Sequence, residues 1–126
     1  MESRGNLKIH YGGRNHGINE VSSHFHFGPD YRNNIGPRLA HGSKFSNSWH
    51  GWHTYALEWP ADHMITYVEG EEIMHLRTPN EGWWKRARLF GWNILDKGGK
   101  NSPFDQPFQL ILNVAVGGNF FPDYAS

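Results

Sequence analysis

The sequence predicts an all-β domain, and three observations favour a β-sandwich. Apolar and polar residues alternate with a period of two over several stretches, as in strands that bury one face. No stretch keeps the 3.6-residue apolar period of a helix over three turns. Aromatic residues make up 15% of the 126 residues and accompany 15 Gly, a mixture typical of strands and tight turns. The length allows one domain.

The first predicted strand covers residues 21–27. Its alternation places Ser22, His24 and His26 on one face. The opposite face is mostly apolar and carries Val21, Ser23, Phe25 and Phe27. A Gly-Pro-Asp sequence at residues 28–30 ends the strand.

Two further segments show the same pattern. Residues 53–59 alternate and stop at Pro60, because proline cannot donate to a strand ladder. Residues 65–74 predict a β-hairpin, since Gly70 separates two β-type segments and can take the positive φ of a tight turn.

The longest predicted strand covers residues 108–116. One face of this segment is wholly apolar, and Asn113 interrupts the other. Residues 28–51 and 95–103 lack periodicity and are rich in Gly, Asn and Ser, which predicts long surface loops.

Composition excludes several classes of partner and site. Lys plus Arg and Asp plus Glu are equal at 12 each, so we expect no nucleic-acid partner and no attraction to anionic lipid. The apolar run at residues 110–116 is too short to span a bilayer. The absence of Cys rules out disulfides, thiolate zinc sites and a Cys nucleophile, and no G-x-S-x-G motif is present.

The histidines allow a metal site as one alternative. His24 and His26 stand two residues apart on one strand face, and His50 and His53 could add ligands. No Asp or Glu accompanies them at ligand spacing, so we expect no metal here and interpret these histidines as sugar-facing or structural.

Tryptophans in polar surroundings favour a carbohydrate ligand. Trp49, Trp52, Trp83, Trp84 and Trp92 lie near Asn, His, Gln and Arg. A pyranose is held in this way, with its apolar faces on aromatic rings and its hydroxyls on amides and imidazoles. We predict Trp83, Trp84 and Trp92 as binding residues, with burial in the core as the alternative for about half of the tryptophans.

Three segments carry a resemblance to a known family. They are HTYALEW at residues 53–59, YVEG at 67–70 and PFDQPFQLILNVAVGGN at 103–119. They resemble the laminarinase-like branch of glycoside hydrolase family 16. Residues 2–6 and 23–29 further resemble the invertebrate β-1,3-glucan-binding proteins, also called lipopolysaccharide and β-1,3-glucan-binding proteins.

The resemblance implies a fold and a position within it. Residues 1–126 would form the C-terminal half of a concanavalin-like jelly-roll sandwich, as a partial family 16 domain without its N-terminal part. The family's active-site strand reads E-x-D-x-x-E, and Met1-Glu2 matches only its last two positions. Glu2 would be the acid/base carboxylate, and the nucleophile would precede Met1. Since a retaining glycosidase needs both carboxyls, we expect no turnover by this chain alone.

The resemblance also implies site residues and functions. It places His26 beside the cleft, with Gln106 and Asn113 near it. The first implied function is recognition of β-1,3-glucan, and of lipopolysaccharide, by a secreted innate-immune protein whose signal peptide is not in this chain. The alternative is a retaining endo-β-1,3-glucanase. No cofactor is implied, although the family allows a structural calcium ion whose ligands no compact acidic cluster marks.

Overall fold

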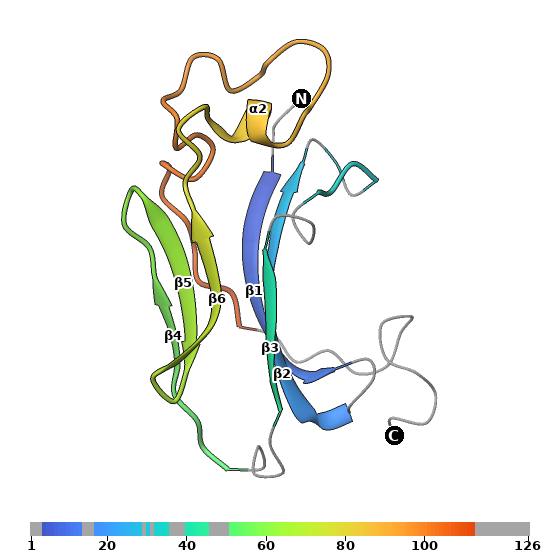
Figure 1. The fold of residues 1–126 in the computed structure, drawn as a ribbon, viewed down its shortest axis with the longest axis vertical. Coiled ribbons are helices and arrows are strands. Elements are labelled where there is room, and N and C mark those ends of the chain that lie inside the picture. Colours follow the sequence, from blue (N-terminus) through green and yellow to red (C-terminus); the bar gives the residue numbers. More distant parts are fainter. Residues whose placement is uncertain are drawn as a thin grey trace.

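A computed structural model describes residues 4–13, 17–28, 30, 32–35, 40–45 and 51–112; for residues 4–13, 17–19 and 45 it describes the backbone. Two antiparallel sheets face each other and form a sandwich (Figure 1). The first sheet has the order β1-β2-β3 and the second the order β4-β5-β6. The strands are β1 (Arg4–Gly13), β2 (Gly17–Gly28), β3 (His41–Phe45), β4 (Tyr55–Glu58), β5 (His63–Val68) and β6 (Glu71–Arg77). One helical turn, α2 (Trp83–Arg86), follows β6, so the all-β prediction is confirmed.

Strand β2 confirms the first predicted alternation. The four residues predicted for its inner face, Val21, Ser23, Phe25 and Phe27, are all buried. The strand ends at Gly28, where a side chain would meet the backbone carbonyl oxygen of Asn33 at 2.2 Å. Only glycine permits this close return of the chain, which the Ile35 N–H secures by donating to the Phe27 carbonyl (2.9 Å).

The predicted hairpin is confirmed as β5 and β6. Its turn residues Glu69 and Gly70 have φ angles of 53° and 77°. Two successive positive φ values are the signature of a type I′ turn, whose twist matches that of the flanking strands. Strand β4 lies within the predicted segment 53–59 and pairs with β5.

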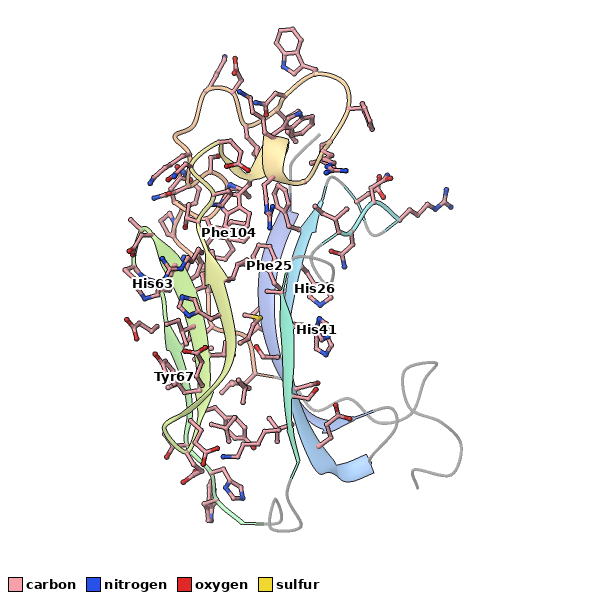
Figure 2. The ribbon with its side chains drawn as sticks, viewed as in Figure 1. Phe25, His26, His41, His63, Tyr67 and Phe104 are labelled. Carbon is pink, nitrogen blue, oxygen red and sulfur yellow. The ribbon has the colours of Figure 1, made fainter. Side chains whose placement is uncertain are left out.

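The core between the sheets is aromatic at one end. Phe25 and Phe27 of β2 meet Trp83 and Phe104 from the region after β6, with ring centroids 5.0 to 6.0 Å apart. Met64, Met74 and Leu76 extend this cluster along β5 and β6. Figure 2 shows Phe25 and Phe104 pointing toward each other between the sheets. Rings from distant segments thus join the two sheets.

Strand β3 corrects the prediction of a continuous loop over residues 28–51. Its sequence has no β-branched residue and gives little strand signal. A Cβ added to Gly42 would lie 1.5 Å from the carbonyl oxygen of Ile73, so β3 rests directly on the backbone of β6. Close packing against β6, in addition to pairing with β2, positions this strand.

The prediction of a strand from residue 108 is wrong for residues 108–112. These residues belong to no strand of the described part, and Leu110, Ile111 and Leu112 are 79 to 88% exposed. Apolar residues form a strand only where a neighbouring strand can pair with their backbone, and none of the described strands does so here. Residues 113–116 lie outside the described residues. The other predicted loop, residues 95–103, is confirmed as a series of turns.

Candidate functional site

The outer face of the first sheet gathers histidines from two strands. We call it the histidine face, and its described side chains are Glu20, Ser22, His24, His26, His41 and Ser43. Alternation sends these side chains away from the core between the sheets, because their β2 neighbours Val21, Ser23, Phe25 and Phe27 point inward; Ser22 is nevertheless buried, at 4% exposure. Figure 2 shows His26 and His41 on the side of the first sheet that faces away from the second sheet.

The imidazoles on this face form a continuous row. His24 and His41 are direct partners across β2 and β3, and their rings stack with centroids 6.3 Å apart and 15° between their planes. His26 follows along β2, with its ring centroid 6.4 Å from that of His24. The Ser22 hydroxyl lies 3.1 Å from Nε2 of His24. The Ser22–Ser43 pair therefore lies beside the His24–His41 pair, and His26 follows next along β2.

Asn34 selects the tautomer of the neutral His26 ring. The backbone N–H of Phe27 donates to Oδ1 of Asn34 (3.1 Å), so the other end of this amide is its Nδ2 donor. That Nδ2 lies 2.7 Å from Nδ1 of His26 and donates to it. Because Nδ1 accepts, the neutral ring carries its hydrogen on Nε2. His26 is thus held as a hydrogen-bond donor at Nε2.

Asp30 shapes the turn that brings Asn34 to this position. Its Oδ1 accepts the N–H groups of Arg32 (2.8 Å) and Asn33 (3.0 Å), and Oδ2 accepts the Asn33 side-chain amide (2.9 Å). The hydrogen bond from the Asn33 side chain is the first cause that lowers the pKa of Asp30. The carboxylate therefore stays charged while it organises the turn.

The histidine face favours neutral imidazole at His24. Burial is the main cause that lowers the pKa of His24, and the neighbouring charge of His41 lowers it further. Glu20 opposes this shift, and its Oε1 accepts a hydrogen bond from the Ser43 hydroxyl (2.8 Å). A row of imidazoles, hydroxyls and an anchored amide offers both donors and acceptors, which suits a ligand rich in hydroxyl groups.

The structure distributes the predicted site residues over different places. Trp83 is 1% exposed, and its ring packs against Phe25, Phe27 and Phe104, so for this residue the structure favours the core alternative. Trp92 is 85% exposed. Trp84 of α2 is half-buried. Gln106 donates to Asp105 (3.0 Å) near Trp59 and Phe108. Of the predicted set, His26 lies on the histidine face, and Glu2 and Asn113 lie outside the described residues.

The alternative metal set is not assembled in the described part of the chain. His53 lies near Glu69 of the β5–β6 turn, with Nδ1 3.5 Å from Oε1, and not beside His24. His50 lies outside the described residues. Among the residues that are described, no three His, Asp or Glu side chains gather to hold a metal ion. It stays a prediction that these histidines hold no metal. The structural calcium ion that the family allows also stays a prediction.

Sequence reasoning missed a second cluster, on the outer face of the second sheet. His63 lies between two carboxylates, with Nδ1 2.9 Å from Asp62 Oδ1 and Nε2 3.0 Å from Glu58 Oε1. The Tyr67 hydroxyl donates to Glu58 Oε2 (2.9 Å), and the His75 ring centroid lies 5.7 Å from that of His63. Figure 2 shows His63 and Tyr67 on this face. Extending the alternation of residues 65–68 back by two positions would have found His63.

In the part of the chain that the structure describes, no helix has the length and apolar character needed to cross a membrane.

Comparison with known proteins identifies relatives of two kinds. The chain is 33% identical over 126 residues to the glucan endo-1,3-beta-glucosidase A1 of Niallia circulans, a match that covers 95% of this chain and 15% of that protein. It is 35% identical over 133 residues to the beta-1,3-glucan-binding protein of Penaeus monodon, covering 98% of this chain and 34% of that protein. A third match, to the glucan endo-1,3-beta-glucosidase of Cryptopygus antarcticus, is 34% identical over 70 residues and covers 56% of this chain and 22% of that protein.

The matched relatives are much longer, since the chain spans about a third or less of each of these three. No protein-family model matches the chain. No solved structure gives a significant match either. The curated matches nevertheless confirm the resemblance: this chain is a relative of the laminarinase-like endo-1,3-β-glucanases and the β-1,3-glucan-binding proteins.

Proposed function

We propose that this chain is part of a protein that recognises β-1,3-glucan, and that the histidine face contacts the polysaccharide. The observation that carries the proposal is the anchored imidazole of His26, whose proton position is set by Asn34. The resemblance places this histidine beside the family's cleft. The relatives from Penaeus monodon and Galleria mellonella are named for binding β-1,3-glucan, which supports the same ligand.

The chemistry of the face fits a neutral polysaccharide. Each sugar hydroxyl is both a donor and an acceptor, and neutral imidazole offers one nitrogen of each kind. His24 and His26 follow one another along an extended strand, and His41 lies beside His24 on β3, so the imidazoles recur along one line. Such a line can contact successive residues of a polymer. A small molecule would use only part of it.

Hydrolysis is the second candidate function, because the relatives from Niallia circulans and Cryptopygus antarcticus are named as glucan endo-1,3-beta-glucosidases. A retaining mechanism needs two carboxyls about 5 Å apart. Glu20 is the one carboxylate among the described β2 and β3 side chains of the histidine face, and Ser43 already donates to it. Catalysis would therefore depend on Glu2 and a nucleophile beyond the described residues.

The finer parts of the proposal concern the whole protein. We place it among secreted innate-immune recognition proteins, with lipopolysaccharide as a second ligand. The support is the resemblance of residues 2–6 and 23–29 to the invertebrate binding proteins.

Binding of laminarin to the purified chain tests the proposal. Isothermal titration calorimetry should show saturable binding, and His26→Ala should weaken it about 10-fold, since a lost hydrogen bond costs about 0.5–1.5 kcal/mol and tenfold corresponds to about 1.4 kcal/mol. His75→Ala is the matched control, because it removes an exposed imidazole from the outer face of the second sheet. Equal affinity of the two variants would contradict the proposed site.

Two further arms separate the alternatives. Competition by lipopolysaccharide for bound laminarin would support the second ligand, and its absence would remove it. Release of reducing ends from laminarin by the purified chain would favour hydrolysis over recognition. We expect no release.

A further inference from the structure

A pocket lies beside α2, between residues 80–85 and the turns of residues 93–102. We call it the α2 pocket, and its volume is about 280 Å³. Its wall includes Trp83 and Trp84 of α2 and the side chains of Asn80 and Asn93. It shares no residue with the histidine face, whose described side chains come from β2 and β3.

The wall contains an unused donor. The indole Nε1 of Trp83 is buried and has no hydrogen-bond partner among the described residues. A buried N–H without an acceptor is costly, so such groups usually have a partner in the complete system. A ligand oxygen that enters the pocket, with a small shift of the wall, would supply that acceptor. Trp84 is half-buried beside it and presents part of its ring as an apolar surface.

The charges of the wall select a neutral ligand. Glu81 and Asp96 are balanced by Lys85 and Lys100, and the other side chains of the wall are uncharged. Because these four charges sum to zero, the wall favours the binding of neither an anion nor a cation. The amide of Asn80 adds a donor and an acceptor, and Asn93, whose Oδ1 accepts the Leu95 N–H (3.0 Å), adds a donor. An aromatic surface together with amides and balanced charges suits a ring that has apolar faces and peripheral hydroxyls.

The size of the pocket restricts the ligand to one ring. Pockets for small molecules usually hold about 300–1,000 Å³, and the α2 pocket lies just below that range. We propose that the α2 pocket binds a single neutral pyranose, either as a free sugar or as the terminal residue of a glucan chain. The choice of a glucosyl ligand rests on the proposed function, while the pocket itself is independent of the histidine face.

Titration with methyl β-glucoside, followed by the indole ¹H–¹⁵N resonances, tests this site. The resonances of Trp83 and Trp84 should shift saturably, and that of Trp92 should not. Trp84→Ala should weaken binding about 10-fold, because it removes the stacking surface. Trp92→Ala is the matched control, since Trp92 is exposed and lies outside the pocket wall. Asn80→Ala, at an exposed residue, gives a second pocket variant that spares the core.

Further ligands distinguish a free sugar from the end of a glucan chain. A further variant distinguishes the α2 pocket from the histidine face. Binding of laminaribiose with the affinity of the glucoside supports a chain terminus, whereas its exclusion supports a free sugar. Sorbitol should not bind, because it lacks a ring to stack. His26→Ala should leave glucoside binding unchanged even where it weakens laminarin binding, so the two sites can fail separately. Absence of saturable shifts, or an equal loss of glucoside affinity in the Trp84 and Trp92 variants, would contradict pyranose binding in the α2 pocket.

Discussion

His24 and His41 oppose each other across the β2–β3 pair, with their rings nearly parallel and their centroids 6.3 Å apart. Two imidazolium ions at this separation repel each other. Burial of His24 acts in the same direction, and the pKa of His24 falls below 6.5, its ordinary value. Protonation of His24 is therefore disfavoured by its burial and by a charge on His41.

We predict that His24 titrates below pH 6.5 and that His41→Gln raises its pKa part of the way back. The recovery is partial because burial is the larger cause. The folded state binds fewer protons at His24 than the unfolded state, so its contribution to stability falls as the pH drops from about 6.5 through the folded pKa. NMR titration of the imidazole resonances measures this shift. An unchanged His24 pKa in His41→Gln, with His75→Gln as control, would contradict the coupling.

His63 should behave in the opposite way. The hydrogen bond to Glu58 is the main cause that raises the pKa of His63, and it also lowers the pKa of Glu58. The stabilisation at His63 is present below about pH 6.5 and is lost as the pH rises through its folded pKa. The stabilisation at Glu58 is present above about pH 4.5 and is lost as the pH falls through its folded pKa.

Glu58→Gln tests this pair. It should lower the pKa of His63 and remove part of the pH dependence of unfolding, as measured by urea titration across this range. Tyr67→Phe retains the carboxylate and should leave the His63 pKa raised. If Glu58→Gln and Tyr67→Phe changed the His63 titration equally, the direct pair would not be its cause.

Gly42→Ala should destabilise the chain by about 1–3 kcal/mol or more, the usual cost of overpacking. The added Cβ would lie 1.5 Å from the Ile73 carbonyl oxygen, so β3 would have to move away from β6. Urea unfolding measures the loss. Gly51→Ala is the control, since its Cβ would lie 4.0 Å from the nearest atom, Nε2 of His53. Similar stability of both variants would contradict the close packing of β3.

The apolar segment at residues 110–112 should promote self-association. Its three side chains are 79 to 88% exposed, and contiguous exposed apolar surface favours association. The double variant Leu110→Ser and Leu112→Ser should shift the concentration at which analytical ultracentrifugation detects larger species to higher values. Serine substitution at exposed Phe90, elsewhere on the surface, controls for lost hydrophobicity in general. If the serine variant of Phe90 changed self-association as much as the double variant, residues 110–112 would not be its specific cause.

Local alternation was sufficient to predict β2 and the β5–β6 hairpin, because each of these strands buries one face. It was insufficient for β3, whose position depends on the contact between Gly42 and Ile73, which are distant in sequence. The same limit applies to the tryptophans. Trp83 and Trp92 both stand in polar stretches, and only the arrival of Phe25 and Phe104 buries the first of them.

The candidate site was predicted in part. His26 follows from the strand pattern and the resemblance, whereas Asn34 reaches it through a turn whose shape depends on Asp30. His41 joins the row only because β3 pairs with β2 in one register. Nothing in the sequence near His41 indicates that register.

The pKa of His24 is lowered and that of His63 is raised, so the difference in charge between these two residues depends on pH. These two residues occupy outer faces of different sheets, and His63 takes up its proton at a higher pH than His24. As the surroundings acidify, the charge contributed by this pair therefore arrives first on the side away from the proposed glucan contact. Over that interval the proton on His63 offsets one of its two neighbouring carboxylates, Glu58 and Asp62, while the opposite, hydroxyl-binding side remains uncharged at His24.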